Sequence, residues 1–526
     1  MEISAFAQYL DSLEGLVKKA CAHFDGDLDE EQIELYDLAF VQAELLAART
    51  LITQTEQSQH LVPVCQYFCA NAIVTITQKL AVRPQTFGLS QSELPSLEKL
   101  QDFLAPEAIA SLGRQYLEEG LVDHSLDDEK RIIRDTFKEF ADDVVKPLAE
   151  AVHRKDLLVP PEILEPLKAM GVFGLSVPER FGGLKPDTTE DSMGMVIVTE
   201  ELSRGSLGAA GSLITRPEIM ARALLEGGTN EQQARWLPQI ASGQTLCAVS
   251  VTEPNTGSDV ASVALKATRT NGGWVLDGGK TWCTYAGAAG ALLVLARTDA
   301  YAEPAHKGLS LFVVEKPSYD GHFFEFEQGD GGKMTGRAIP TLGYRGMHSF
   351  EMSYDNFFVP DDCLIGGKAG EGKGFYFTMR GFMGGRLQTA ARACGLMRAA
   401  FEESMNYSQD RMVFGRSVAS YPLSLAKLAR MGALITACKA FTAHVAGLMD
   451  QGLGQMEASL VKLFSCRAAE WVTREGVQIH GGMGYAEEVA VSRYFADARV
   501  LSIFEGAEET LAVRVVGKSL VDQARN

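Results

Sequence analysis

The chain has 526 residues, of which 46% are hydrophobic, and this length and composition are typical of a soluble protein with three or four domains. Its formal net charge of -19 at pH 7 argues against nucleic-acid or anionic-membrane partners, because binding phosphates needs a basic face. The first residues carry acids where a signal peptide needs a basic region, and no stretch of about 18 uninterrupted apolar residues occurs. We therefore expect a cytoplasmic protein that binds no nucleic acid and no membrane.

Four regions follow from the hydrophobic pattern, and together they predict a mainly α-helical protein with a central β-domain. Apolar residues recur at helical spacing over residues 1–120, which predicts an N-terminal helical extension, and a second helical domain is expected over 121–245. Short β-branched runs bounded by Gly, Asn and Asp predict a β-barrel or sandwich domain over 246–360. Long helical segments over 361–526 then predict an antiparallel helical bundle.

The nine cysteines are scattered, odd in number and without a CxxC pair, so neither a zinc site nor a disulfide framework is expected. Cys65 and Cys69 stand four residues apart, on one face of a predicted helix. No histidine or carboxylate is placed to complete a metal site with them, so burial is the favoured interpretation. We expect no metal in this protein.

Four motifs follow one another along the chain. They are VSVTEPNTGSD at 249–259, GGKTWCT at 278–284, RMVFG at 411–415 and QIHGGMGY at 478–485. Each alone has an ordinary explanation: a hairpin turn, a core tryptophan, a solvated arginine at a helix end, and a plain glycine-rich loop. Together and in this order they resemble the signature stretches of the acyl-CoA dehydrogenases, and the similarity extends from about residue 125 to 520. The resemblance implies an α-domain, a β-barrel domain and a C-terminal four-helix bundle, to which this chain adds the N-terminal extension.

The resemblance implies a site for FAD. In the family the strand backbone and the threonine of the first motif hydrogen-bond the flavin, the tryptophan of the second covers it, and a following threonine binds near its N5. Tyr285 replaces an asparagine that usually follows this threonine. The arginine of the third motif reaches the pyrophosphate bound by a neighbouring subunit, so a homodimer or homotetramer is expected. The implied cofactor-binding residues are Val249, Val251, Thr252, Trp282, Thr284, Arg411, Phe414, Gln478, Gly481 and Gly482.

The stretch Phe504-Glu505-Gly506 resembles the family motif that carries the catalytic base. By this resemblance Glu505 removes the α-proton of an acyl thioester, while the β-hydrogen leaves as hydride to flavin N5. Such a proton is a very weak acid, so the site must desolvate the carboxylate and stabilise the enolate oxygen with donors. A subset of the family carries the base on an earlier helix, but the matching residue here is Gly385, which has no side chain. The implied substrate-binding residues are Ser258, Arg386 and Gly506.

Three features narrow the acyl group. The extension, the stretch RGMHS at 345–349 and the stretch GRLQTA at 385–390 resemble the branch of the family that oxidises (2S)-methylsuccinyl-CoA to mesaconyl-CoA in the ethylmalonyl-CoA pathway. A dicarboxylic thioester needs a cation or several donors in the pocket. Arg216 is the first candidate for this ion pair, although a solvated arginine at a helix start is an equal alternative, and Arg380 is the second candidate.

Two other functions stay open. One is dehydrogenation of an uncharged short branched acyl-CoA, and the other is binding of a macromolecule such as DNA by the same fold. The acidic net charge and the absence of a Lys/Arg-rich terminal block argue against DNA. The resemblance further implies an electron-transferring flavoprotein as the electron acceptor. The helical pattern around residues 35–80 is similar to that of 424–475, so we expect the extension to cover a tetramer surface and leave a dimer.

Overall fold

The computed structural model describes residues 2–24, 26–122 and 126–525. The chain forms two compact units. The bundle unit contains the residues up to Asp135 and from Thr389 onward, and the sheet unit is Thr136–Gln388. Helices precede and follow a central sheet, which confirms the prediction of a mainly helical chain with a central β-domain and a helical N-terminal extension.

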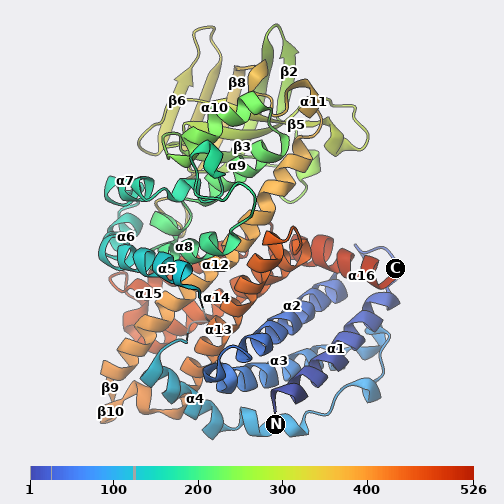
Figure 1. Ribbon diagram of the computed structural model, residues 1–526, viewed down its shortest axis with the longest axis vertical. Helices are drawn as coiled ribbons and strands as arrows, with labels where there is room; N and C mark the ends of the chain where they lie inside the picture. The colour runs from blue at the N-terminus through green and yellow to red at the C-terminus, as the bar shows by residue number, and fades with distance from the viewer. Residues whose placement is uncertain (1, 25, 123–125, 526) are drawn as a thin grey trace. The chain divides into compact units, whose positions relative to one another are not determined.

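The bundle unit joins the N-terminal extension to the C-terminal helices. The extension helices α2, α3 and α4 lie beside α13, and α2 also packs on α14 and on the π-helical segment η14, whereas α1 packs on α2, α3 and α16 (Figure 1). The apolar positions Leu35, Leu38 and Val41 are fully buried, as the helical spacing predicts. The elements are α1 (Ile3–His23), α2 (Gln32–Thr55), α3 (Val62–Val82), α4 (Pro106–Glu119), α5 (Asp128–Phe140), α12 (Gly374–Asp410), β9 (Met412–Val413), β10 (Arg416–Ser417), α13 (Pro422–Asp450), α14 (Gln455–His480), α15 (Ala490–Leu501), η14 (Thr510–Gly517) and α16 (Lys518–Arg525), of which α5 and α12 extend into the sheet unit.

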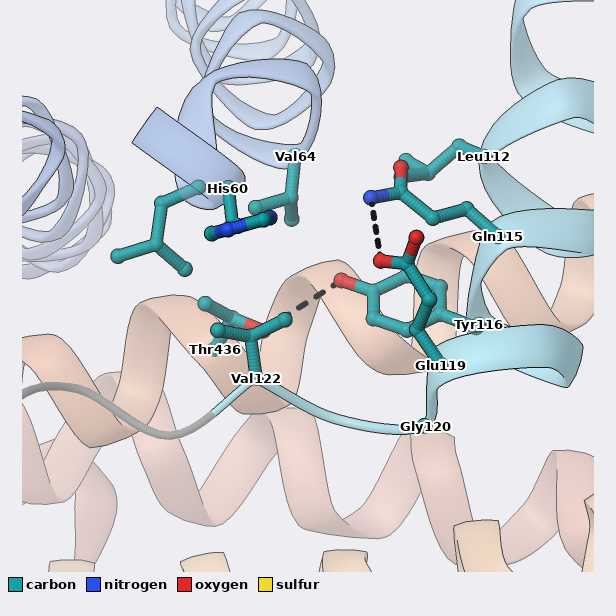
Figure 2. Close-up of a pocket in the computed structure, with 10 residues that line it drawn as sticks. His60, Val64, Leu112, Gln115, Tyr116, Glu119, Gly120, Val122 and Thr436 are labelled. Carbon is teal, nitrogen blue, oxygen red and sulfur yellow. Dashed lines mark hydrogen bonds between the residues drawn. The ribbon is translucent and has the colours of Figure 1, made fainter. Parts of the chain in front are cut away.

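Glycines allow α4 and α13 to approach closely. A Cβ atom at Gly113 would lie 2.3 Å from the carbonyl oxygen of Leu425, and one at Gly432 would lie 2.5 Å from the ring of Tyr116. Figure 2 shows a small pocket at this contact, where the Tyr116 hydroxyl lies 3.4 Å from the hydroxyl of Thr436. The extension is therefore packed into the bundle unit at atomic contact distance.

The two long apolar helical stretches and the cysteines are buried inside the fold. The helical stretches Gln59–Val82 and Pro422–Asp450 are long and apolar enough to cross a membrane, but 61% and 72% of their apolar windows are buried inside the fold. Burial of this extent is typical of core helices in a bundle. All nine cysteines are free and buried, so the expectation of buried thiols is confirmed, including for Cys65 and Cys69.

The sheet unit is built on one curled sheet of eight strands in the order β1-β4-β2-β3-β8-β7-β6, with β5 beside β4. Helices α9 and α10 share its core, where Leu224 and Trp236 pack with the buried strand residues (Figure 1). Helix α10 begins with a capping box between Thr229 and Gln232. The strands are β1 (Cys247–Ser250), β2 (Lys266–Thr270), β3 (Gly273–Thr284), β4 (Ala291–Arg297), β5 (Leu309–Glu315), β6 (Phe323–Glu327), β7 (Lys333–Ala338) and β8 (Ser349–Pro360), and the helices are α6 (Lys146–Arg154), α7 (Pro161–Ala169), α8 (Ser192–Gly205), α9 (Thr215–Gly227), α10 (Asn230–Ala241) and α11 (Gly367–Gly370).

Candidate active site

The first two motifs are joined inside the sheet unit by a buried ion pair. Lys280 donates to the carboxylate of Glu253 at 2.9 Å and to the carbonyl of Val251 at 2.7 Å. Burial lowers the pKa of Lys280 to about 8, and the charge of Glu253 opposes that effect. The same carboxylate accepts the backbone N–H groups of Ala264 and Leu265 at 2.8 and 2.7 Å. These contacts hold the end of β1 against β3, where both motifs lie.

The predicted flavin-contacting residues lie along this junction. The N–H of Thr281 donates to the carbonyl of Thr252 at 2.9 Å, so the predicted contacts of the two motifs are neighbours. The pairing of β3 with β8 shifts register between Lys280 and Cys283, and Trp282 within that shift has a φ of 56°. Its side chain is 55% exposed, which is unusual for a tryptophan on a central strand. Val251 is buried, Val249 and Thr252 are half-buried, and Ser258 is exposed.

Thr284 ends β3 in contact with β8. Its hydroxyl lies 2.9 Å from that of Ser349, and both side chains are buried. Tyr285 has a φ of 69°, and its N–H donates to the carbonyl of His348 at 2.7 Å. The Tyr285 side chain is buried, so this replacement of the family's usual asparagine is part of the local packing.

Arg216 stands at the start of α9, as expected, but it is only 6% exposed. The alternative of a solvated arginine is therefore wrong. Its Nη1 donates to the hydroxyl of Tyr344 at 3.1 Å, and Tyr344 is itself buried with a φ of 62°. Arg380, the second candidate, is exposed and lies 3.7 Å from the carboxylate of Glu226, so its charge faces a surface partner.

A buried carboxylate, Glu218, lies beside Gly384, the residue before the helix position where a family subset places its base. A Cβ atom at Gly384 would lie 2.2 Å from Glu218 Oε1, so a side chain there would have to displace the Glu218 carboxylate. Glu218 accepts from the Arg222 guanidinium at 2.7 Å and from the amide of Gln388. Because both its oxygens are engaged, Glu218 serves as an anchor between α9 and α12. The sequence analysis missed both Glu218 and Tyr344, although Tyr344 directly precedes the RGMHS stretch.

Glu505 lies in the bundle unit, in a turn between α15 and η14. It is half-buried and has a φ of 55°, a conformation that costs about 1–3 kcal/mol for a residue other than glycine. The buried Lys462 donates to the carbonyl of Gly506 at 2.7 Å, and the Arg392 guanidinium lies 4.6 Å from the ring centre of Phe504. Two buried cations thus hold the turn in its strained conformation.

Most of the remaining candidates lie on the surface of the bundle unit. Arg411 is exposed at the end of α12, and Phe414, in the β9–β10 hairpin, is 98% exposed with a φ of 48°. Gln478 is exposed at the end of α14, and Cβ atoms at Gly481 and Gly482 would meet no atom within 4 Å. The space around Gly482 therefore does not require glycine, whereas the φ of 59° at Gly481 favours glycine there. Arg386 lies on α12 in the sheet unit and is half-buried.

Comparison with protein-family models matches three consecutive domains. The models are described as the N-terminal, middle and C-terminal domains of acyl-CoA dehydrogenase, and they match residues 127–244, 248–357 and 372–521. Residues 1–126 lie outside all three models.

Individual proteins agree with these matches. The chain is 44% identical over 399 residues to a (2S)-methylsuccinyl-CoA dehydrogenase of Cereibacter sphaeroides, covering 76% of this chain and 70% of that protein. It is 32% identical to a mitochondrial 2-methylacyl-CoA dehydrogenase of Solanum tuberosum, covering 75% of this chain and 91% of the relative. The structure of butyryl-CoA dehydrogenase from Megasphaera elsdenii is similar with a TM-score of 0.69 and 27% identity, over 76% of this chain and all of that one.

Proposed function

Because the chain belongs to the acyl-CoA dehydrogenase family, we propose that it is an FAD-dependent enzyme that oxidises (2S)-methylsuccinyl-CoA to mesaconyl-CoA in the ethylmalonyl-CoA pathway. The identity of 44% to a protein named for this substrate supports the proposal. The observation that carries it is Arg216, a buried cation on α9 whose guanidinium is oriented by Tyr344.

The donor set fits FAD. A half-exposed indole at Trp282, strand backbone at Val251 and Thr252, and an ordered hydroxyl at Thr284 offer a flat apolar cover beside hydrogen-bonding groups. Open space over Gly481 and Gly482 suits the close approach of a group from outside the chain. FAD held by Trp282, Thr252 and Thr284 would supply the acceptor for the hydride that leaves the substrate.

The residues of this chain then have separate roles. Glu505 takes the α-proton of the thioester, and the contacts of Lys462 with Gly506 and of Arg392 with Phe504 hold the turn that carries it. The Lys280–Glu253 pair fixes the flavin-contacting strand ends before substrate arrives, which avoids reorganisation during the reaction. Ser258 and Arg386 are proposed to contact the CoA portion of the substrate, as their resemblance to family residues implies.

Arg216 is proposed to bind the distal carboxylate of the substrate. Arg216 is a buried guanidinium that donates to Tyr344, and a planar, always charged guanidinium is the kind of group that binds a carboxylate. A substrate whose acyl chain ends in an apolar group would place that group beside Arg216 and offer no carboxylate to its charge, which costs binding energy. Arg216 thus favours a dicarboxylic thioester over a monocarboxylic one of equal size.

Replacing Arg216 tests this proposal. Arg216→Met should lower kcat/KM for (2S)-methylsuccinyl-CoA by roughly 30-fold or more relative to 2-methylbutanoyl-CoA, which lacks the distal carboxylate. Arg380→Ala, on the surface of the same unit, is the matched control and should change neither value. Equal losses on both substrates would exclude Arg216 from the pocket.

The second candidate is a dehydrogenase of uncharged branched acyl-CoA thioesters. It is favoured by the 32% identity to the protein named 2-methylacyl-CoA dehydrogenase. Stopped-flow measurement of flavin bleaching separates the two: faster bleaching of the wild-type enzyme by 2-methylbutanoyl-CoA than by (2S)-methylsuccinyl-CoA would favour this second function.

We further infer that the enzyme is a dimer that passes electrons to an electron-transferring flavoprotein. The exposed Phe414 and Tyr485 offer an apolar surface of the kind that subunit contacts cover, and the extension covers α13 and α14 of its own chain. Light scattering tests the assembly. A dimer is expected, and a tetramer that disappears when residues 1–120 are deleted would contradict the covering role of the extension.

A further inference from the structure

Two histidines and an aspartate meet in the sheet unit at a place that none of the four motifs includes. Asp156 lies in the loop after α6, His322 directly precedes β6, and His348 directly precedes β8. Their potential ligand atoms all lie within 4.8 Å of one another. Asp156 Oδ1 is 3.0 Å from His348 Nε2 and Asp156 Oδ2 is 3.9 Å from His322 Nε2, so each carboxylate oxygen faces a different imidazole.

We propose that Asp156, His322 and His348 form a binding site for a divalent transition-metal ion of the Zn²⁺ type. Imidazole nitrogen and carboxylate oxygen bind Zn²⁺ at about 2.0–2.2 Å, which places ligand atoms of a tetrahedral site roughly 3.3 Å apart. The carboxylate lies 3.0 Å from one imidazole and 3.9 Å from the other, and all the ligand atoms lie within 4.8 Å, so side-chain rotations that draw the atoms together would bring them onto one ion. Three protein ligands leave a fourth position for water or another small ligand.

The backbone and the burial of the cluster favour this assignment. Asp156 has a φ of 53°, so the loop holds a non-glycine residue in the left-handed region in order to present its carboxylate between the two rings. His348 is almost fully buried, and its Nε2 faces the Asp156 carboxylate at 3.0 Å. His322 and Asp156 are both partly exposed, which gives an ion access from solvent.

Arg345 is the competing cation. Its Nε lies 3.5 Å from Asp156 Oδ1, and a positive charge at this distance weakens metal binding. However, Arg345 also donates to the carbonyl of His153 at 2.8 Å and to the carbonyl of Thr341 at 3.3 Å. These carbonyls keep the guanidinium in place when the carboxylate turns toward a metal ion.

The site is connected to the strand ends described above. The carbonyl of His348 accepts the Tyr285 N–H, and the next residue, Ser349, contacts the Thr284 hydroxyl. A metal ion that fixes the His348 ring would therefore also affect the position of Thr284. If Thr284 contacts flavin as proposed, metal binding would change the absorbance of the bound flavin. Metal binding itself does not depend on the proposed dehydrogenase function.

Equilibrium dialysis of the chelator-treated full-length holoenzyme against Zn²⁺ alone tests the proposal. The wild type should bind one Zn²⁺ per chain in a saturable way, and His322→Ala should lose this binding. In Asp156→Asn the dissociation constant for Zn²⁺ should rise by roughly tenfold or more. His306→Ala, which removes a histidine that hydrogen-bonds Tyr376 elsewhere in the sheet unit, should retain the full equivalent.

His322 is half-exposed, so its replacement leaves the fold intact, and circular dichroism of each variant verifies this. Zn²⁺ should also raise the melting temperature of the wild type and of His306→Ala but not of His322→Ala. Absence of a saturable equivalent in the wild type, or the same binding in His322→Ala as in the wild type, would overturn the metal site.

Discussion

The N-terminal extension and the sheet unit are both well packed, but they bury different kinds of side chain. Within residues 2–24 and 26–120 the buried polar residues are three threonines, two of which bond to carbonyls of their own helix, and one half-buried carboxyl, Glu44, has its pKa raised to about 8 by burial. The sheet unit instead buries charged groups, among them Lys280, Glu253 and Lys316. Burying a charge costs energy unless partners are built around it, so such groups mark places where geometry matters beyond stability.

The difference indicates what each region contributes. Apolar burial in the extension supplies stability and covers α13 and α14, and it makes few demands on any single position. The Lys280–Glu253 pair does the opposite, because it ties specific backbone atoms of two motifs together at 2.7–2.9 Å. The following experiments test this contrast, beginning with the largest expected effect.

Replacing the proposed base should stop the reaction while leaving both units folded. In Glu505→Gln the neutral amide cannot accept the α-proton, so the rate of flavin reduction by substrate should fall by at least about 100-fold. Stopped-flow absorbance measures this rate, and flavin content and acyl-CoA binding should be unchanged. Glu509→Gln, an exposed neighbour, is the matched control. Ordinary bleaching in Glu505→Gln would show that another group is the base.

Breaking the buried ion pair tests the sheet unit. Lys280→Met leaves the Glu253 carboxylate buried without its cation, which should cost about 3–5 kcal/mol in the free energy of unfolding and lower the flavin content. Adding Glu253→Gln should restore part of the stability, because no uncompensated charge then remains. Urea unfolding and flavin absorbance measure the two effects.

Truncation in the extension is the matching experiment on the other region. Leu38→Ala removes a fully buried side chain and should cost about 2–5 kcal/mol, close to the effect of Lys280→Met. Flavin content below the unfolding transition should nevertheless stay at the wild-type value. If Leu38→Ala lost flavin as Lys280→Met does, the contrast between the two regions would be false.

The ion pair also predicts the sign of a pH effect. Burial lowers the folded-state pKa of Lys280 to about 8, whereas a lysine in an unfolded chain titrates near 10.4. Between about pH 8 and pH 10 the unfolded chain therefore binds more protons, and the stability contributed by this lysine rises with pH. Urea unfolding across this range should show that the free energy of unfolding rises more steeply with pH in the wild type than in the Lys280→Met/Glu253→Gln variant. An equal slope would mean that Lys280 titrates alike in both states.

The smallest expected effect comes from a contact between the extension and the turn that carries Glu505. Tyr36 on α2 donates to the carboxylate of Glu508, three residues after Glu505, and Arg467 binds the same oxygen at 2.6 Å. Tyr36→Phe should cost about 0.5–1.5 kcal/mol of stability. We also expect a severalfold lower kcat at unchanged KM, since the turn would be held less firmly. Tyr9→Phe, which removes a hydroxyl bonded to the carbonyl of Ser96, is the control and should leave kcat unchanged.

Local patterns predicted the order of the elements well. Helical spacing in the extension and β-branched runs in the sheet are short-range signals, and both correspond to observed elements. Buried cysteines were also predictable, because the sequence offers no ligand near Cys65 and Cys69. Sequence alone could not decide whether Arg216 is a pocket residue or a solvated arginine. The residue pattern of a helix start is the same whether it faces solvent or a core.

The sequence by itself determined the family, the order of the domains and the motif residues, because each of these depends on residue types at short separations. Only the tertiary structure decided which of these residues meet. Tyr344 reaches Arg216, Glu253 reaches Lys280, and Asp156 reaches two histidines from more than 160 positions away. Such pairs depend on the register of β3 with β8 and on how α6 and α9 pack within the sheet unit, and no short-range pattern encodes either.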